Sequence, residues 1–472
     1  MTEMSTTAFK DNVAKALADD QLQFAMTETG PRFIAKRTKA REALPEFDQL
    51  RDQARGIKDH VLDHLDIYLE RYEAKVKETG GHVHWAETPD EARAAVLEIC
   101  RKANAKMVTK GKSMISEEID LNRHLEENGI TPVETDLGEY IIQLRNERPS
   151  HIIAPAVHLT RGQVEADFRR VHTHLDPGRD LSEIPSLVEE ARGVLRRKYL
   201  TADVGITGAN FLIAETGSSI IVTNEGNGDL TQTLPKVHIV LASIEKLVPT
   251  LEDATTILRV LARSATGQEF SNYTTFSTGG RRPGDPDGPA EYHVILLDNG
   301  RANVLGTEFQ DMLRCIRCGA CLNHCPVYNA VGGHAYGWVY PGPIGSVVTP
   351  ALVGIEKARH LPNASTFCGR CEEVCPMRIP IPKMLRHWRE KEFERHLQPT
   401  TMRWGLGLWA WVAKRPKLYR RATALAARVL ANQAHGKGRL KKAPLASGWT
   451  EFRDFPAPQG KTFHRLWKER RS

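Results

Sequence analysis

Seven of the eight cysteines lie between residues 315 and 375, and this clustering constrains the fold more than any other feature. The stretch "CIRCGACLNHCP" fits the pattern C-x2-C-x2-C-x3-C-P at every position, with Cys315, Cys318, Cys321 and Cys325. A second stretch, "STFCGRCEEVCP", repeats the pattern with Cys368, Cys371 and Cys375. Ser365 stands there in place of the first cysteine.

The spacing predicts two iron–sulfur clusters that share the two motifs. Three thiolates two residues apart can wrap around one cubane, and the fourth cysteine, before proline, ligates the other cluster in two-cluster ferredoxins. Exchanging the last cysteines gives a complete first set: Cys315, Cys318, Cys321 and Cys375. The second set is Cys325, Cys368 and Cys371. Both clusters are expected to be of the [4Fe–4S] type.

Two alternatives concern the metal and its fourth ligand. Structural zinc needs two C-x2-C pairs and would leave thiols over, so the pattern favours iron–sulfur clusters. At Ser365, the serine oxygen could bind the fourth iron, or the cluster could hold three irons, or a small ligand could close the site. Serine is a poor ligand for a soft metal and also a common turn residue. Cys100, in the apolar rhythm of "AAVLEIC", is predicted to be a buried helical cysteine.

Charge and composition indicate a globular protein with a basic tail. The net charge is +7, yet residues 376–472 hold 23 Lys and Arg against 6 Asp and Glu, with six of the eight tryptophans. Without a recognisable nucleic-acid motif, such a tail favours contact with a protein or an anionic membrane surface. The amino terminus lacks a secretory signal, and the apolar stretch at 404–413 is too short to span a bilayer. A cytoplasmic location is expected.

The periodicity predicts an α/β fold in four segments. Residues 1–80 are predicted to be helical, with Val61, Leu65, Tyr68, Leu69 and Tyr72 on one face. Residues 81–302 alternate helices with strands, which indicates an α/β domain. The helix prediction there covers "EARAAVLEICRKANA", and the strand predictions cover "HIIAPAVHL", "FLIAETGSSIIVTNEGNG", "KVHIVLA" and "YHVILLD". Residues 303–385 are predicted to form a helical two-cluster ferredoxin-like domain, and residues 386–472 a basic, Trp-rich helical region.

The α/β segment offers a second candidate site. In "TNEGNGDL", Asn224, Glu225, Gly226 and Gly228 follow a predicted strand, where open α/β sheets bind ligands. Glu225 could be a nucleophile or base in acyl or ester chemistry, or an exposed side chain of a Gly/Asn turn. Four further polar residues have similar positions in the α/β segment: Lys112, Ser113, Asp136 and Glu139. No G-x-G-x-x-G fingerprint follows a predicted strand, so a nicotinamide-dependent dehydrogenase is not supported.

Long blocks of the sequence resemble the lactate utilisation protein B family, iron–sulfur proteins of bacterial L-lactate oxidation. The resemblance extends over nearly the whole chain and rests on "GKSMISEEIDLNRHLEENGI", "VETDLGEYIIQL", "SHIIAPAVH", "GITGANFLIAETGSSIIVTNEGNG", "IRCGACLNHCPVYNAVGGHAYGWVYPGPIG" and "STFCGRCEEVCP". It implies an α/β domain related to CoA-transferase and sugar-isomerase folds, followed by a two-cluster domain and a distinctive C-terminal region.

The resemblance also implies a function and partners. The family's second motif likewise has three cysteines, which gives the same two ligand sets. The implied role is electron transfer during oxidation of L-lactate to pyruvate, beside two sister proteins, one cysteine-rich and one a smaller α/β protein. Three hypotheses therefore stand: a redox subunit, a catalytic α/β domain or substrate-binding open cluster, and a scaffold that docks through its tail.

Overall fold

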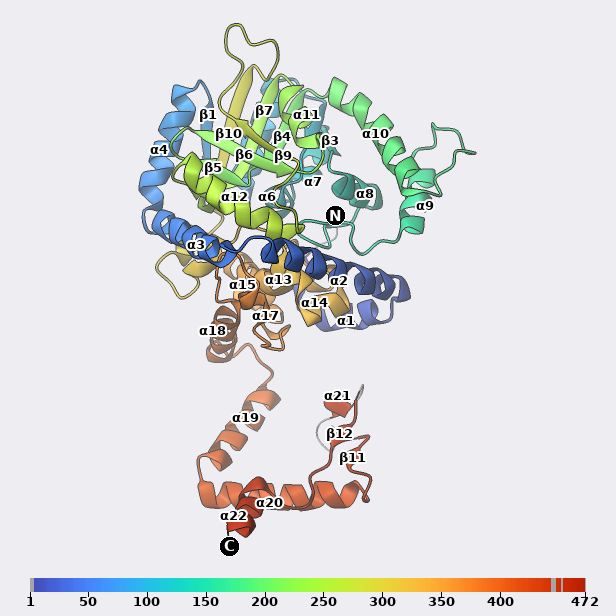
Figure 1. Cartoon of the computed structure of the whole chain (residues 1–472), viewed down its shortest axis with the longest axis vertical. Coiled ribbons are helices and arrows are strands. Elements are labelled where there is room, and N and C mark those ends of the chain that lie inside the picture. The colour runs from blue at the N-terminus through green and yellow to red at the C-terminus, as the bar shows by residue number, and fades with distance from the viewer. Residues whose placement is uncertain (1–3, 443–446, 451–452, 472) are drawn as a thin grey trace. The chain divides into compact units, whose positions relative to one another are not determined.

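The computed structural model describes residues 4–442, 447–450 and 453–471 (Figure 1). These residues form two compact units, one ending at Glu392 and the other beginning at Phe393. The first unit contains the N-terminal helices, the α/β sheet and all eight cysteines. The segment with the two cysteine motifs therefore belongs to the same compact body as the sheet.

The N-terminal segment is helical, as predicted, but its amphipathic pattern is interrupted at His64. The helices are α1 (Phe9–Leu17), α2 (Asp20–Glu42), α3 (Phe47–Asp63) and α4 (Leu65–Glu78). His64 has φ −133° and ψ 36°, outside the helical region, and separates α3 from α4. Val61, Leu65, Leu69 and Tyr72 are buried on one face nevertheless, and Tyr68 is partly buried.

A six-stranded parallel sheet with strand order β1-β10-β7-β4-β2-β3 forms the centre of the first unit (Figure 1). Its strands are β1 (His82–Ala86), β2 (Met107–Lys110), β3 (Thr131–Glu134), β4 (Val204–Gly208), β7 (Val237–Ser243) and β10 (Glu291–Leu297). In register, Val108 pairs with Val204 and Val204 with Val237. Strands β7 and β10 are apolar almost throughout because both faces of a parallel sheet are covered.

Helices and a smaller sheet cover the two faces. Helices α5 (Pro89–Lys102), α6 (Met114–Glu118) and α7 (Leu121–Glu127) contribute to the core on one face, which includes the buried Cys100. On the other face the core includes α4 and the second sheet. That sheet has the order β8-β5-β6-β9, with β5 (Phe211–Ile213), β6 (Ser218–Thr223), β8 (Leu247–Val248) and β9 (Tyr273–Ser277).

The remaining helices of the α/β part lie at the sheet's edge and ends. Helices α8 (Leu137–Arg145), α9 (Arg161–Val171) and α10 (Ile184–Thr201) share a core with Val133 of the edge strand β3. Helix α11 (Asn227–Thr233) follows β6, and α12 (Leu251–Ala265) packs against α3 and α2. The mixed α/β fold class predicted from the sequence is confirmed.

One predicted strand is wrong. "HIIAPAVHL", residues 151–159, is a buried loop with turns. The Ser150 amide donates to the Pro155 carbonyl at 2.9 Å, and His151 Nδ1 accepts from the amides of Ile153 (3.1 Å) and Ala154 (3.2 Å). Ile152 and Pro155 are buried and the other apolar residues are partly buried, but these local hydrogen bonds replace a strand ladder.

Short helices carry the cysteine segment. They are α13 (Ala320–Asn323), α14 (Pro326–Val331), α15 (Gly342–Val353), α16 (Ile355–Ala358), α17 (Arg370–Glu373) and α18 (Ile381–Glu394). The second unit holds α19 (Thr400–Ala413), α20 (Pro416–Gln433), α21 (Ser447–Thr450), α22 (Phe463–Arg471) and the antiparallel pair β11 (Arg439–Leu440) and β12 (Phe455–Pro456). Across the described part of the chain, no helix combines the length and apolarity that crossing a membrane requires.

Candidate iron–sulfur centres

The predicted first ligand set surrounds one cavity. Cys315, Cys318, Cys321 and Cys375 line it together with the apolar side chains of Ile152, Ile316, Ile344, Met377, Ile379 and Ile381. Cys318, Cys321 and Cys375 are buried, and Cys315 is partly buried. Cys375 comes from the second motif, so residues of both motifs line this one cavity. Four thiols in an apolar pocket fit the donor set of a [4Fe–4S] cubane.

The predicted second ligand set forms a separate group closer to the surface. Burial, together with the neighbouring thiols of Cys325 and Cys368, raises the pKa of Cys371 to about 12. Cys325 and Cys371 are buried, whereas Cys368 is exposed. Cys371 also lies near Cys321 of the first set. The two groups are therefore neighbours; the thiols of the first are buried or partly buried, and the second is open to solvent at Cys368.

The two motifs have the same backbone conformation. Arg317, before the second cysteine of the first motif, has φ 59°, and Phe367, at the same register in the second, has φ 53°. Gly319 and Gly369 have φ 72° and 79°, and each precedes a one-turn helix, α13 or α17. A side chain at position 319 would also meet the His151 ring at 2.9 Å. Ser365 thus occupies the structural equivalent of Cys315.

Ser365 itself takes part in a turn. Its Oγ accepts a hydrogen bond from the Phe367 amide at 3.1 Å, and its carbonyl accepts from Arg389 at 3.2 Å. The Arg389 guanidinium stacks on the exposed Phe367 ring at 4.1 Å. The one ligand position that cysteine does not fill is therefore partly buried, three residues before the exposed Cys368.

Replacing Ser365 with Cys is expected to protect the second cluster from oxidation. A thiolate at this position would complete a four-cysteine set, because the backbone already matches that of the first motif. After brief exposure to air, the wild type should show a three-iron signal by electron paramagnetic resonance, and the variant should show several-fold less. Thr366→Cys, which adds a thiol one residue further along the chain, should show the same three-iron signal as the wild type. Equal three-iron signals in Ser365→Cys and wild type would contradict the assignment.

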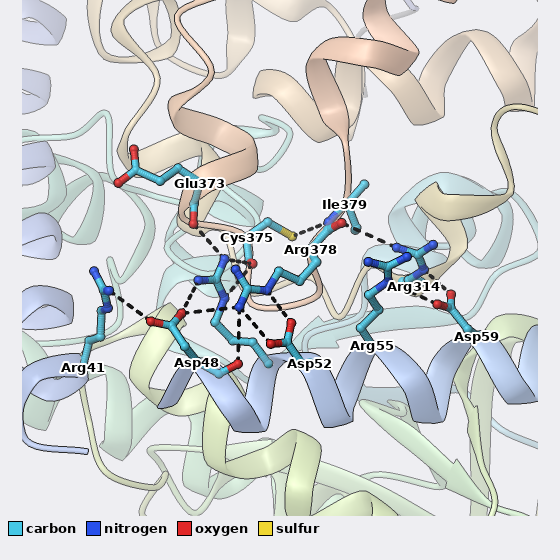
Figure 2. A network of polar contacts seen from close by, with 11 residues as sticks. Arg41, Asp48, Asp52, Arg55, Asp59, Arg314, Glu373, Cys375, Arg378 and Ile379 are labelled. Carbon is cyan, nitrogen blue, oxygen red and sulfur yellow. Dashed lines mark hydrogen bonds and ion pairs between the residues drawn. The ribbon is translucent and has the colours of Figure 1, made fainter. Parts of the chain in front are cut away.

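Arginines from the N-terminal helices hold the loop that carries Cys375. Arg37 donates to the Val374 carbonyl at 2.8 Å. Arg51 donates to the carbonyls of Cys375 and Glu373, at 2.7 Å in each case. Figure 2 shows this loop above α3, with Arg378 reaching Asp52 at 2.8 Å. The amide of Ile379 donates to Cys375 Sγ at 3.5 Å.

These arginines were not predicted as functional residues. No sequence pattern within α2 or α3 distinguishes Arg37 and Arg51 from the other basic residues of those helices. Both are buried, with 6% and 4% of their surface exposed, which marks them only once the fold is known. Hydrogen bonds and positive charge around a cluster tune its reduction potential, so these helices belong to the cluster environment.

The candidate residues of the α/β part converge on a second cavity of about 570 Å³. Lys112, Ser113, Asp136 and Glu225 all line it. Asn224 and Gly228 line it too, whereas Gly226 is not among the lining residues. Glu139 is buried behind Lys112, with 3.4 Å between its Oε1 and Lys112 Nζ. Partial burial and the nearby Asp136 raise the pKa of Glu225, although the residue as a whole is exposed.

Comparison with known proteins agrees with this architecture. The LUD domain family matches residues 69–297, the 4Fe–4S dicluster domain matches 311–379, and "Lactate utilisation protein B, C-terminal" matches 370–472. Lactate utilization protein B of Bacillus licheniformis is 41% identical over 99% of this chain and 98% of its own. The Bacillus subtilis protein of the same name is 40% identical, over 99% and 97%. The chain belongs to the lactate utilisation protein B family.

Another family relative carries a name that refers to electron transport. The "uncharacterized electron transport protein YkgF" of Escherichia coli is 40% identical over 98% of this chain and 97% of its own. A solved DUF162 family protein from Deinococcus radiodurans aligns with 49% of the chain at 18% identity, with a TM-score of 0.26, and covers 98% of its own length.

Membership of this family, together with the dicluster match, defines the cofactors. The chain carries two [4Fe–4S] clusters in the segment that holds the seven cysteines. The thiols present fit that requirement: four converge on one apolar cavity and three form the adjacent group. When bound, each cluster supplies a one-electron redox centre.

Proposed function

We propose that this chain passes electrons through its two clusters while L-lactate is oxidised to pyruvate. Oxidation of one lactate releases two electrons and two protons, and two cubanes can accept one electron each. The names of the relatives support the link to lactate utilisation. The observation that carries the relay is the arrangement of the thiols: an enclosed group beside an adjacent group that reaches the surface at Cys368.

In this proposal the second cluster exchanges electrons with a partner and the first lies inside the protein. Electron transfer needs close approach, and the exposed Cys368 and Phe367 give a partner access to the second cluster. The partners proposed are the two sister proteins, one cysteine-rich and one a smaller α/β protein. Hydride or proton chemistry on lactate then belongs to the assembly rather than to this chain alone.

Anaerobic mixing with lactate tests the relay. The oxidised protein alone should keep its visible absorption when L-lactate is added. With both sister proteins present, bleaching and a reduced-cluster paramagnetic signal should appear, to about two electrons per chain. D-lactate serves as the matched control. Reduction by lactate without the sisters would mean that this chain oxidises lactate itself, and no reduction with them would refute the relay.

The competing proposal places catalysis in the α/β cavity. It rests on Glu225, whose carboxyl lies in the same cavity as Asp136 and Lys112. If the cavity performs acyl or ester chemistry, iron-depleted protein should still turn over a thioester, and Glu225→Gln should abolish that turnover. Loss of all activity together with the clusters would favour the relay.

Docking of the sisters is proposed for the second unit. Helix α19 buries none of its residues, and Trp404, Trp409 and Trp411 expose 77%, 63% and 51% of their surface. Exposed aromatic side chains of this kind, with basic residues around them, are typical of interaction sites. An anionic membrane surface is the alternative occupant.

Substituting these three tryptophans with serine should weaken association at least tenfold without loss of iron, because their rings contribute little to packing within the unit. Pull-down of each sister protein and flotation with anionic vesicles distinguish the two occupants. Leu425→Ser, on the exposed surface of α20, serves as the control with a single exposed apolar side chain removed. Unchanged binding to the sisters and to vesicles would exclude α19 as the docking element.

A further inference from the structure

The α/β cavity lies where open parallel sheets bind ligands. From β2 the chain continues outward to β3, whereas from β4 it continues in the opposite direction, to β7 and β10. The adjacent strands β2 and β4 therefore form the topological switch point. The residues at and just after their carboxyl ends, Gly111 to Ser113 and Gly208 to Asn210, line the cavity. Crevices at the carboxyl ends of such strands are the usual ligand sites of this architecture.

Cationic groups in this cavity lack hydrogen-bond acceptors. Among the described residues, none accepts a hydrogen bond from Lys112 Nζ, or from Nε and Nη1 of Arg317. The Arg317 side chain is 10% exposed, and its Nη2 lies 3.5 Å from Glu245 Oε1. Lys246 lines the same cavity. Buried donors without partners are costly, so three such nitrogen atoms on two residues that line one cavity indicate an anionic ligand.

The carboxyl group of Glu139, which lies beside Lys112, does not provide a full negative charge to balance the lysine. Burial raises the pKa of Glu139 well above its usual range, and the nearby Asp136 raises it further. A carboxyl group with a raised pKa is protonated more readily, so Glu139 offsets the charge of Lys112 only in part. Despite burial, Lys112 in turn lowers the pKa of Asp136, which lines the same cavity, so Asp136 is the carboxylate with which an anionic ligand competes for Lys112.

The walls of the cavity specify an aliphatic ligand body. Apolar side chains predominate, among them Ile115, Ile141, Ile153, Ile221 and Leu261. The described residues that line the cavity include no aromatic side chain on which a flat ring could stack. Its volume of about 570 Å³ is in the range of pockets that hold ligands much larger than lactate.

The cavity also reaches the first cluster. Arg317 lies between Cys315 and Cys318 in the sequence and, with Ile152, lines both the α/β cavity and the four-thiol cavity. The Arg317 guanidinium packs over the Tyr340 ring at 4.7 Å, which holds the side chain in place. A ligand bound to Arg317 therefore lies one side chain away from the loop that carries two cluster ligands.

We propose that this cavity is a binding site for an aliphatic carboxylate, held by Lys112 and Arg317 next to the first cluster. A chain that only relayed electrons between partners would need no such site, so the inference goes beyond the proposed relay. The ligand's carboxylate accepts hydrogen bonds from Lys112 and Arg317, and its aliphatic body packs against the isoleucine side chains of the cavity wall. L-lactate and longer-chain carboxylates share this chemistry.

Calorimetric titration of the anaerobic holoprotein tests the site with four probes: hexanoate, L-lactate, 1-hexanol and inorganic phosphate. Hexanoate should bind most tightly, since each additional buried methylene tightens binding by about fourfold. 1-Hexanol and phosphate should bind at least tenfold more weakly than hexanoate, because 1-hexanol lacks the carboxylate and phosphate lacks the aliphatic chain. This comparison requires no variant.

Substitution of Lys112 adds a positional test. Lys112→Met should weaken hexanoate binding roughly tenfold or more, because it removes a charge-assisted hydrogen bond. Lys106→Met, on the exposed residue just before the same strand β2, should bind as the wild type. Hexanoate should also shift the paramagnetic signal of the first cluster in wild type. Equal binding of hexanoate and 1-hexanol, or equal affinities of Lys112→Met and Lys106→Met, would overturn the proposal. Lactate-driven reduction tests the relay separately and does not depend on this result.

Discussion

Cys375→Ala is expected to remove the first, enclosed cluster, although Cys375 stands in the second motif. Cys375 lines the same cavity as Cys315, Cys318 and Cys321. Iron should fall from about eight to about four atoms per chain, with a matching loss of sulfide. The second cluster, which has Cys368 at the surface, should remain. Iron and sulfide determination under anaerobic conditions, with paramagnetic spectra before and after air exposure, measures the outcome.

The air sensitivity of the cluster that remains in each variant shows which ligand set the substitution has disrupted. In Cys375→Ala, the surviving cluster should still yield a three-iron signal in air, because its Ser365 position is unchanged. In Cys368→Ala, the surviving cluster should be enclosed and resist air. Cys100→Ala, in the core of the α/β part, removes a thiol that belongs to neither group and should retain about eight irons. Retention of the air-resistant cluster in Cys375→Ala would show that the motifs do not exchange their last cysteines.

The grouping of the cysteines could be inferred from the sequence because its determinants are local, and the assignment of ligands to each cluster stays a prediction. Three cysteines two residues apart constrain one loop, and the pairing of motifs follows from the fourth cysteine before proline. Strands such as β7 and β10 were predictable for a similar reason, since a run of apolar β-branched residues suits a strand covered on both faces. The repeated left-handed backbone at Arg317 and Phe367 then explains why Ser365 can replace a cysteine without altering the loop.

Features that depend on distant contacts were not predictable. Arg37 and Arg51 reach the Cys375 loop across more than three hundred positions of sequence, and no local pattern marks them. The loop at 151–159 was mistaken for a strand because an apolar run indicates burial but not hydrogen-bond pattern. The residues of the α/β cavity were singled out one by one, but their convergence with Arg317 of the cysteine segment required the fold.

Arg301→Met is expected to destabilise the first unit by about 3–5 kcal/mol. Arg301 is 1% exposed and donates to both oxygens of Glu118, at 2.9 and 2.7 Å. Its Nε lies 3.0 Å from Glu245 Oε2. Glu118 also accepts from the Tyr340 hydroxyl at 2.6 Å, which connects the α/β part to the cysteine segment. Without the guanidinium, two buried carboxylates lose their main counter-charge, and that desolvated charge dominates the cost.

Anaerobic urea unfolding of the holoprotein, followed by far-ultraviolet circular dichroism and by cluster absorption, measures this change. Arg259→Met is the matched control, because Arg259 pairs with Glu46 at 2.6 Å while both side chains are more than 40% exposed. Solvent screens such a pair, so the control should lose less than about 1 kcal/mol. Equal losses in the two variants would contradict a special role for the buried network.

The dependence on pH provides an independent check of the same network. Although burial alone raises the pKa of Glu245, Arg301 and Arg317 hold it at about 2. Removing Arg301 should raise the pKa values of Glu118 and Glu245 in the folded protein, so that folding binds protons and stability increases as pH falls. The difference between Arg301→Met and wild type should therefore be smaller at pH 6 than at pH 8. A difference that is constant over this range would mean that lost packing, rather than unpaired buried charge, causes the destabilisation.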